Sequence, residues 1–121
     1  MADKLTEMII GAAIEVHKIL GPGLLESIYE EALCHELSLR ELSVKRQLKI
    51  DILYKGKVIK GQRLDLLVNN EVIVELKSVT SLPEVAMAQT LSYLKASNLK
   101  RALLINFGEK ILIDGIKRIS N

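Results

Sequence analysis

Apolar residues recur at helical spacing in three stretches of the chain. The first pattern predicts a helix over residues 4–19, which Gly21-Pro22-Gly23 ends with a turn. The second predicts a helix from about residue 25 to residue 42, and the third predicts one that Pro83 opens and that runs to about residue 97.

The segments around the third helix alternate instead, as β-strands do. Strands are expected over residues 46–54, 57–68, 71–77, 101–107 and 111–118, with turns at 55–57, 69–70 and 108–110. The order of elements is ααβββαββ. We expect an α/β fold with a mixed central sheet of about five strands flanked by helices. The first three strands form a meander, and the crossover helix allows a parallel neighbour.

Composition narrows the class of protein. A length of 121 residues predicts a single domain over residues 1–121. Aromatic residues make up 3% of the chain, so the core must be aliphatic and a base-stacking platform is not expected. The chain has one cysteine, Cys34, which we interpret as a small buried filler, and two histidines, His17 and His35, which we interpret as helix-surface residues.

No stretch approaches the ~20 apolar residues that cross a bilayer, and the first residues lack the pattern of a targeting signal. We therefore expect a cytoplasmic protein with no membrane partner. The charge is uneven, since residues 1–43 hold eight acids and three bases, whereas residues 44–121 hold seven acids and fourteen bases. This asymmetry indicates an anionic ligand on the second part or two solvated faces of opposite sign.

Two acids, Asp65 and Glu75, interrupt apolar strands, where an uncompensated charge is costly. A two-residue turn would send their side chains to different faces of the sheet. A three-residue turn over residues 69–71 pairs Val68 with Val72 instead, and only this register separates apolar from polar positions. One face then carries apolar residues alone (Leu64, Leu66, Val68, Val72, Val74 and Leu76).

On the second face this register places Asp65 directly opposite Glu75, about 5 Å away, with Lys77 beside them. Two such carboxylates repel each other, and a hard divalent cation removes the repulsion. A lysine next to the ion can orient a water or stabilise phosphate charge, which is the equipment for phosphodiester hydrolysis. The alternative is a cross-strand salt-bridge cluster of the two acids with Lys77 and Arg63.

Three motifs along the chain resemble those of a known family. Asp65, nine intervening residues and then Glu75-Leu76-Lys77 resemble the D…(D/E)-x-K core of the PD-(D/E)XK nuclease superfamily. Upstream, residues 23–29 (Gly-Leu-Leu-Glu-Ser-Ile-Tyr) resemble the signature of its GxxExxY family. Downstream, Gln89-Thr90-Leu91-Ser92-Tyr93 is similar to the Q-x-x-x-Y element of its exonuclease-like branches, and one departure is that no proline precedes Asp65.

The resemblance implies a restriction-endonuclease-like core and a Mg²⁺-dependent nuclease, with Mn²⁺ as a substitute ion. By resemblance, Asp65, Glu75 and the Leu76 carbonyl hold the metal, and Glu26 reaches it directly or through water. Lys77 would align the attacking water. The products would carry 5′-phosphate and 3′-hydroxyl ends.

The resemblance also implies that Gln89 and Tyr93, which lie one helical turn apart, pack over Lys77 and position it or a phosphate. Taken alone, Gln89 and Tyr93 are better explained as an ordinary polar helix edge. Glu26 alone could be an acid that stabilises the start of its helix.

The implied partner is nucleic acid, with DNA favoured over RNA, and a homodimer is one way for so small a domain to cut both strands of a duplex. The bases of residues 45–63 could contact a nucleic-acid backbone or form a solvated hairpin. Two other classes of function stay open, namely a non-catalytic module that binds nucleic acid or protein, and a structural domain held by salt bridges.

Overall fold

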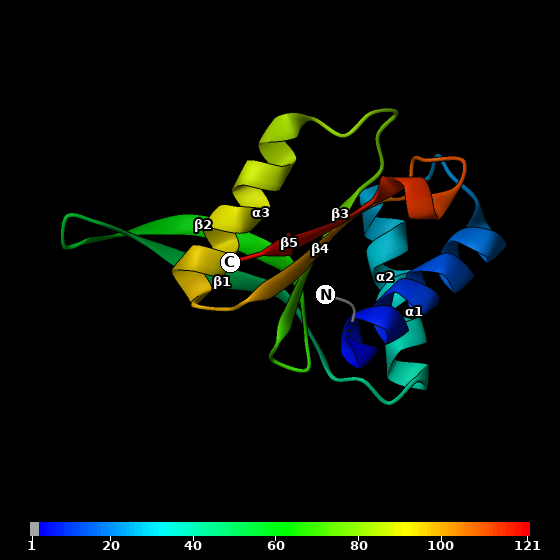
Figure 1. Cartoon of the computed structure of the whole chain (residues 1–121), viewed down its shortest axis with the longest axis horizontal. Helices are drawn as coiled ribbons and strands as arrows, with labels where there is room; N and C mark the ends of the chain where they lie inside the picture. The colour runs from blue at the N-terminus through cyan, green and yellow to red at the C-terminus, as the bar shows by residue number, and fades with distance from the viewer. Residues whose placement is uncertain (1–2) are drawn as a thin grey trace.

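The structure, a computed structural model, describes residues 3–121 and confirms the expected order of elements (Figure 1). The helices are α1 (Lys4–Leu20), α2 (Glu26–Leu39) and α3 (Glu84–Ser97). The strands are β1 (Val44–Tyr54), β2 (Lys57–Val68), β3 (Val72–Lys77), β4 (Arg101–Asn106) and β5 (Ile116–Ser120), and a 3₁₀ helix, η1 (Leu112–Gly115), precedes β5.

The five strands form one mixed sheet in the order β1-β2-β3-β4-β5. The pairs β1–β2, β2–β3 and β4–β5 are antiparallel, whereas β3 and β4 are parallel because α3 crosses over between them. Helices α1 and α2 cover one face and α3 the other, so each face has its own apolar cluster (Figure 1). None of the helices within residues 3–121 is long and apolar enough to cross a membrane.

The predicted register of the β2–β3 hairpin is confirmed. Val68 pairs with Val72, and the three-residue turn places Asn69 and Asn70 in the left-handed region, with φ of 51° and 57°. Asparagine tolerates this conformation better than most residues. The Asn69 side chain also accepts a hydrogen bond of 2.8 Å from the Ser43 amide, which ties the turn to the segment before β1.

The second helix ends at Leu39 and not at residue 42 as expected. Glu41 adopts a φ of 62°, the Leu42 amide donates to the Leu37 carbonyl, and the Glu41 amide donates to the Ser38 carbonyl. This is the Schellman pattern, in which a left-handed residue ends the helix. Glycine usually occupies that position, so a glutamate there left no signal in the sequence.

The last strand was expected from residue 111 but begins at Ile116. The preceding apolar residues turn as η1 because Leu112 packs into the cluster under α1 and α2, and because Gly115 lies against the main chain of Asn106. Pro83 is a smaller difference, since it is the N-cap of α3 and lies one residue before the helix begins.

His17 was expected on the helix surface, but it is buried, with Nε2 2.7 Å from the Glu109 carbonyl oxygen. The loop before η1 folds over the end of α1 and covers it, which the helix pattern alone did not indicate. His35 is exposed, as expected. Cys34 packs partly buried against the α1–α2 cluster, and burial raises the pKa of its thiol to about 11, so it acts as a filler.

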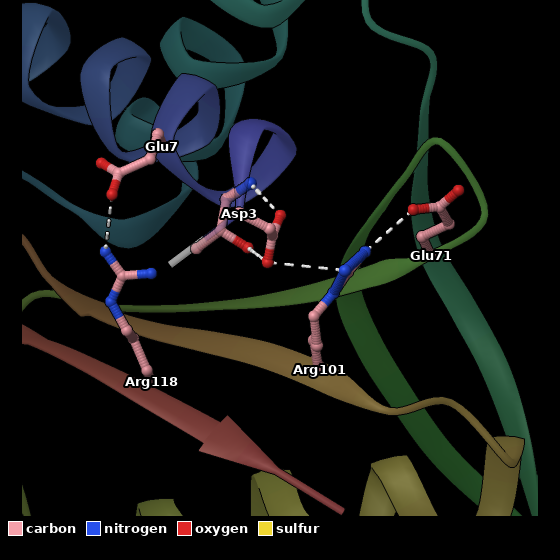
Figure 2. Close-up of polar contacts among 6 residues, drawn as sticks. Asp3, Glu7, Glu71, Arg101 and Arg118 are labelled. Carbon is pink, nitrogen blue, oxygen red and sulfur yellow. Dashed lines mark hydrogen bonds and ion pairs between the residues drawn. The ribbon is translucent and has the colours of Figure 1, made fainter. Parts of the chain in front are cut away.

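Ion pairs fasten the start of α1 to the far strands (Figure 2). Asp3 caps the helix by accepting the Thr6 amide at 2.9 Å. Arg101 of β4 contacts both Asp3 (3.4 Å) and Glu71 (2.8 Å), which follows β2 in the hairpin turn. A second pair joins Arg118 of β5 to a glutamate of α1, Glu7, at 3.5 Å.

Candidate active site

The main-chain ladder between β2 and β3 stops after Leu66 and Val74, and two carboxylates take over the pairing. The Asp65 amide donates to Glu75 Oε2 at 2.6 Å, and the Leu76 amide donates to Asp65 Oδ2 at 2.8 Å. Asp65 and Glu75 are therefore neighbours, as the register predicts. Each acid thus binds the main chain of the opposite strand through its side chain, where the ladder of main-chain hydrogen bonds has ended.

The alternation of side chains between the two faces of the sheet is interrupted in β1 and β2, close to the two acids. Leu64 was expected to share a face with Leu66, but it lies in the cluster under α3, whereas Leu66 lies in the cluster under α1 and α2. Gln47, which lies between the residues that pair with Leu64 and Leu66, has a φ of 51°. This left-handed residue interrupts the alternation, so the expectation for Leu64 was wrong.

The carboxylates are held in an environment that disfavours their charge. Glu75 is 6% exposed, and burial, followed by the charge of Asp65, raises the pKa of its carboxyl to about 8. Burial also raises the pKa of Asp65, although the hydrogen bond from the Leu76 amide opposes the shift. The positive charge of Lys77, which lies two residues after Glu75 on the same strand, opposes the upward pKa shift of both carboxyls. Mutual repulsion was expected, and burial proves to be the larger cause.

The salt-bridge alternative does not describe this cluster. Among the ion pairs of residues 3–121, none joins Asp65 or Glu75 to Lys77 or Arg63. No ion pair within that range therefore offsets the charge of either acid when it is ionised.

The donor atoms here suit a hard divalent cation. Asp65 and Glu75 each use one oxygen on a main-chain amide, which leaves the second oxygen of each carboxylate for another partner. The amide and carbonyl of one strand residue point to the same side, and the Leu76 amide points to Asp65, so the Leu76 carbonyl faces that side as well. Carboxylate and carbonyl oxygens with water are the usual ligands of Mg²⁺.

Glu26 is the first residue of α2, in the turn where the helix dipole favours an acid, and its side chain is exposed. Its negative charge also contributes to the raised pKa of Glu75, after burial and the charge of Asp65. Within the described part of the chain, however, no three Asp, Glu, His or Cys side chains gather closely enough to hold a metal ion together. Of the two expectations for Glu26, direct binding of the metal or binding through water, the second agrees better with this arrangement.

Tyr29, the last residue of the GxxExxY motif, holds the loop that precedes α2. Its ring is buried and stacks on Phe107 with 4.4 Å between the ring centroids. Its hydroxyl donates to the Gly21 carbonyl at 2.5 Å and accepts from the Leu24 amide at 3.1 Å. The Ser78 hydroxyl donates to the Leu24 carbonyl, which joins the same loop to the end of β3, next to Lys77. Tyr29 thus fixes where α2 begins relative to the carboxylates.

The two residues of the Q-x-x-x-Y element, Gln89 and Tyr93, differ in their surroundings. Tyr93 is buried, and burial, followed by the charges of Glu75 and Asp65, raises its pKa. Its hydroxyl donates to Gln62 Oε1 at 3.0 Å, which links α3 to β2. Gln89 is exposed one turn earlier on the helix, and its side chain makes no hydrogen bond within residues 3–121.

The motifs did not reveal a second set of residues that supports Asp65. The Gln47 side chain donates to Glu30 at 2.7 Å, and Arg46 donates to the other oxygen of Glu30 at 2.9 Å. Glu30 raises the pKa of Asp65, and a hydrogen bond from Gln47 lowers it, so both lie beside that carboxylate. Glu30 is four residues after Glu26 and so shares its helix face, which is the one signal that could have identified it.

Two hollows open on the elements that carry the candidate site residues. The first, of about 570 Å³, lies at the start of α2 and includes Glu26 and Ser78. The second, of about 730 Å³, lies on the β1–β2 hairpin and includes Gln62 and Arg63, close in sequence to Asp65. Each hollow thus includes residues that are close in sequence to one of the candidate site residues.

Comparisons with known proteins agree with this geometry. A family model described as the PD-(D/E)XK nuclease superfamily matches residues 3–119. The crystal structure of SSO0001 is similar at a TM-score of 0.52 and 17% identity, over 97% of this chain and 76% of that one, which shows a shared fold. No curated protein matches the chain.

Proposed function

The chain belongs to the PD-(D/E)XK nuclease superfamily, and from this premise we propose that it is a Mg²⁺-dependent nuclease that hydrolyses phosphodiester bonds of nucleic acid. Nucleases of this superfamily generally use divalent metals such as Mg²⁺. The observation that carries the proposal is the crossed pair of Asp65 and Glu75, with Lys77 beside them and no ion pair within residues 3–121 to offset the acids. The loop held by Tyr29 supports the finer assignment to the GxxExxY family.

In this proposal Asp65, Glu75 and the Leu76 carbonyl hold the ion, and Glu26 reaches it through water. Mn²⁺ is the expected substitute, because it prefers the same oxygen ligands. When bound, the ion supplies Lewis-acid stabilisation of the phosphate charge and lowers the pKa of a bound water.

The other proposed roles fall to side chains around the acids. Lys77 lies two residues after Glu75 on the same face, where its ammonium aligns the attacking water and stabilises charge on the phosphate. Tyr93, held by Gln62, covers the site from α3 and supports the position of Lys77. Gln89, exposed on the same helix, contacts a phosphate of the bound strand. Hydrolysis in this arrangement leaves 5′-phosphate and 3′-hydroxyl ends.

The test is cleavage of single- and double-stranded DNA and RNA with Mg²⁺ or Mn²⁺. Both acids bind main-chain amides, so the variants Asp65→Asn and Glu75→Gln keep the shape of the side chain and remove only its charge. The variant Lys77→Gln removes the charge of the lysine. We expect each to lower the cleavage rate by about 10²-fold or more. Two exposed positions provide matched controls, Glu84→Gln and Lys117→Gln, which should cleave like the unaltered protein.

Two results would contradict the proposal. The first is a folded protein that cleaves nothing and whose melting temperature does not rise with Mg²⁺, since an ion bound only by the folded state must raise it. The second is cleavage that the three site variants retain. Binding of nucleic acid with no cleavage would support the non-catalytic module instead.

A further inference from the structure

Beyond Gln47 and Asp65, the β1–β2 hairpin first packs under α3 and then extends from the body of the molecule as a two-stranded arm (Figure 1). We define the arm as residues 48–64. Its tip is a two-residue turn at Lys55-Gly56, with φ of 47° and 81°, and every residue from Leu53 to Arg63 is exposed. The arm begins one residue from Asp65, so whatever it binds lies next to the candidate active site.

The two faces of the arm differ in chemistry. One face is apolar near its base, where Ile50 and Leu64 pack into the cluster under α3. On the opposite face Lys49 pairs with Arg63, and Lys60 Nζ lies 3.3 Å from both carboxylate oxygens of Asp51. These residues line the hollow of about 730 Å³. The face that no helix covers is therefore the basic one.

The charge of the arm stands out against the rest of the chain. Residues 48–64 hold five bases and one acid, a net charge of +4, whereas the whole chain has a net charge of +2. Asp51, the only acid, is already paired with Lys60. Such a surface complements a polyanion.

The backbone also bends within this face. The pairing shifts by one residue between Ile50 and Ile52, and Gly61, opposite the shift, has a φ of 121°. A bulge of this kind bends and twists its strand. Gly61 also lines the hollow of about 730 Å³, so the bulge and the hollow lie at the same place on the arm.

Three features favour duplex DNA over other polyanions. A two-stranded β-ribbon fits the major groove of B-form DNA, which is about 12 Å wide, whereas the major groove of RNA duplexes is too narrow for side chains to enter. Tyr54 is the single aromatic residue of the arm, so a stacking platform for single strands is missing. The tip carries exposed apolar side chains, Leu53 (70%), Val58 (52%) and Ile59 (42%), suited to contact base edges and sugars in a groove.

We propose that the arm binds duplex DNA, with Lys49, Lys60 and Arg63 on backbone phosphates and the apolar tip in a groove. Seven residues from Leu48 to Tyr54 span roughly 23 Å, or about seven base pairs. The arm therefore holds the duplex on one side of Asp65 and Glu75. That this duplex is the substrate rests on the proposed nuclease function, whereas the binding itself does not.

The test measures the affinity of a 20-base-pair DNA duplex by fluorescence anisotropy, in EDTA and over a series of salt concentrations. The triple variant Lys49→Ala/Lys60→Ala/Arg63→Ala should bind at least tenfold more weakly at about 0.1 M salt. The slope of log affinity against log salt should fall by 2–3, at about 0.9 per phosphate contact. The matched control Lys4→Ala/Lys18→Ala/Lys117→Ala removes the same charge from exposed positions elsewhere and should change neither value appreciably.

A second readout separates this proposal from the nuclease proposal. Hydrolysis of bis(p-nitrophenyl) phosphate, a diester too small to reach the arm, should be equal in the unaltered protein and the triple variant. If neither protein hydrolyses the diester or any nucleic acid, and duplex binding is lost only in the arm variant, the nuclease proposal is contradicted and the proposal for the arm is supported.

The proposal that the arm binds duplex DNA would be overturned if the arm variant bound the duplex as well as the unaltered protein does. It would also be overturned if the control variant lost as much affinity as the arm variant. A loss confined to single strands or to RNA duplexes would overturn the assignment to duplex DNA. Should the triple variant fail to fold, the single variants Lys49→Ala and Arg63→Ala provide the same test with a slope change of about 0.9 each.

Discussion

Glu75 shows how the fold sets the chemistry of one residue. The side chain lies on β3, whose first five residues are buried, and the raised pKa of about 8 means that its carboxyl is mostly protonated at neutral pH in the absence of a cation. A cation must displace that proton to bind. Metal affinity should therefore increase as the pH rises towards 8.

The same shift predicts how the stability of the metal-free protein depends on pH. The pKa of Glu75 is raised from 4.5 to about 8, so between these values the folded state holds a proton that the unfolded state has lost. Stability should fall as the pH rises through this window. In EDTA, the melting temperature should decrease from pH 5 to pH 8, and Glu75→Gln should remove most of the decrease. Identical pH profiles for Glu75→Gln and for the exposed control Glu84→Gln would contradict this.

Tyr29 provides a second prediction at the scale of a residue. Tyr29→Phe keeps the stack on Phe107 but leaves the Gly21 carbonyl and the Leu24 amide without their partner. We expect a loss of about 1–3 kcal/mol in the free energy of unfolding, measured with urea. Tyr54→Phe, at an exposed position, should cost less than about 0.5 kcal/mol. Equal effects of the two substitutions would show that the Tyr29 hydroxyl does not hold the loop.

Secondary-structure elements could be predicted where they follow a repeating pattern of apolar and polar residues. Their boundaries could not be predicted where they depend on a single unusual residue. The β2–β3 register followed from alternation, because a one-residue slip would bury the wrong face. The end of α2 was missed because a glutamate, Glu41, takes the left-handed position. The start of β5 was missed because an apolar run, residues 111–113, also suits a turn that packs Leu112 inward.

The connections between elements can be tested at Gly108, which follows β4. A Cβ there would lie 2.1 Å from the Val79 carbonyl oxygen in the loop after β3, too close for any side chain. Gly108→Ala should lower the free energy of unfolding by about 1–3 kcal/mol through overpacking. Gly11→Ala is the control, since its Cβ would meet only the flexible end of Arg40 and alanine favours the helix. Its stability should be equal or higher, and the opposite ranking would show that the two loops move apart freely.

On the scale of the whole molecule, Arg101 joins parts that are far apart in the sequence (Figure 2). It contacts Asp3 at the start of α1 and Glu71 in the β2–β3 turn. Arg101→Gln should cost about 1 kcal/mol of unfolding free energy at low salt and less at 1 M salt, because these pairs are partly exposed. Lys100→Gln, at the preceding exposed position, is the control. A cost that salt does not reduce would indicate lost packing instead of lost ion pairs.

Site residues could be predicted from the sequence where they interrupt the pattern of a strand. They could not be predicted where their role depends on how two elements pack together. Asp65, Glu75 and Lys77 were identified because two charges interrupt apolar strands and their spacing matches a motif. Glu30 and Gln47 were missed because their role depends on α2 packing beside the point where β1 and β2 bend. That contact joins residues 17 apart, and neither residue interrupts an apolar pattern.

The crossed hydrogen bonds between β2 and β3 make two amide protons sensitive to the ionisation of the carboxylates that bind them. The amide protons of Asp65 and Leu76 are held by carboxylates and not by the ladder, so their exchange with deuterated solvent depends on the state of those carboxylates. The amides of Leu66 and Val74, inside the ladder, should exchange only when the sheet opens. Comparing the two pairs by NMR would show ionisation of the site in the resting protein, with no substrate and no turnover.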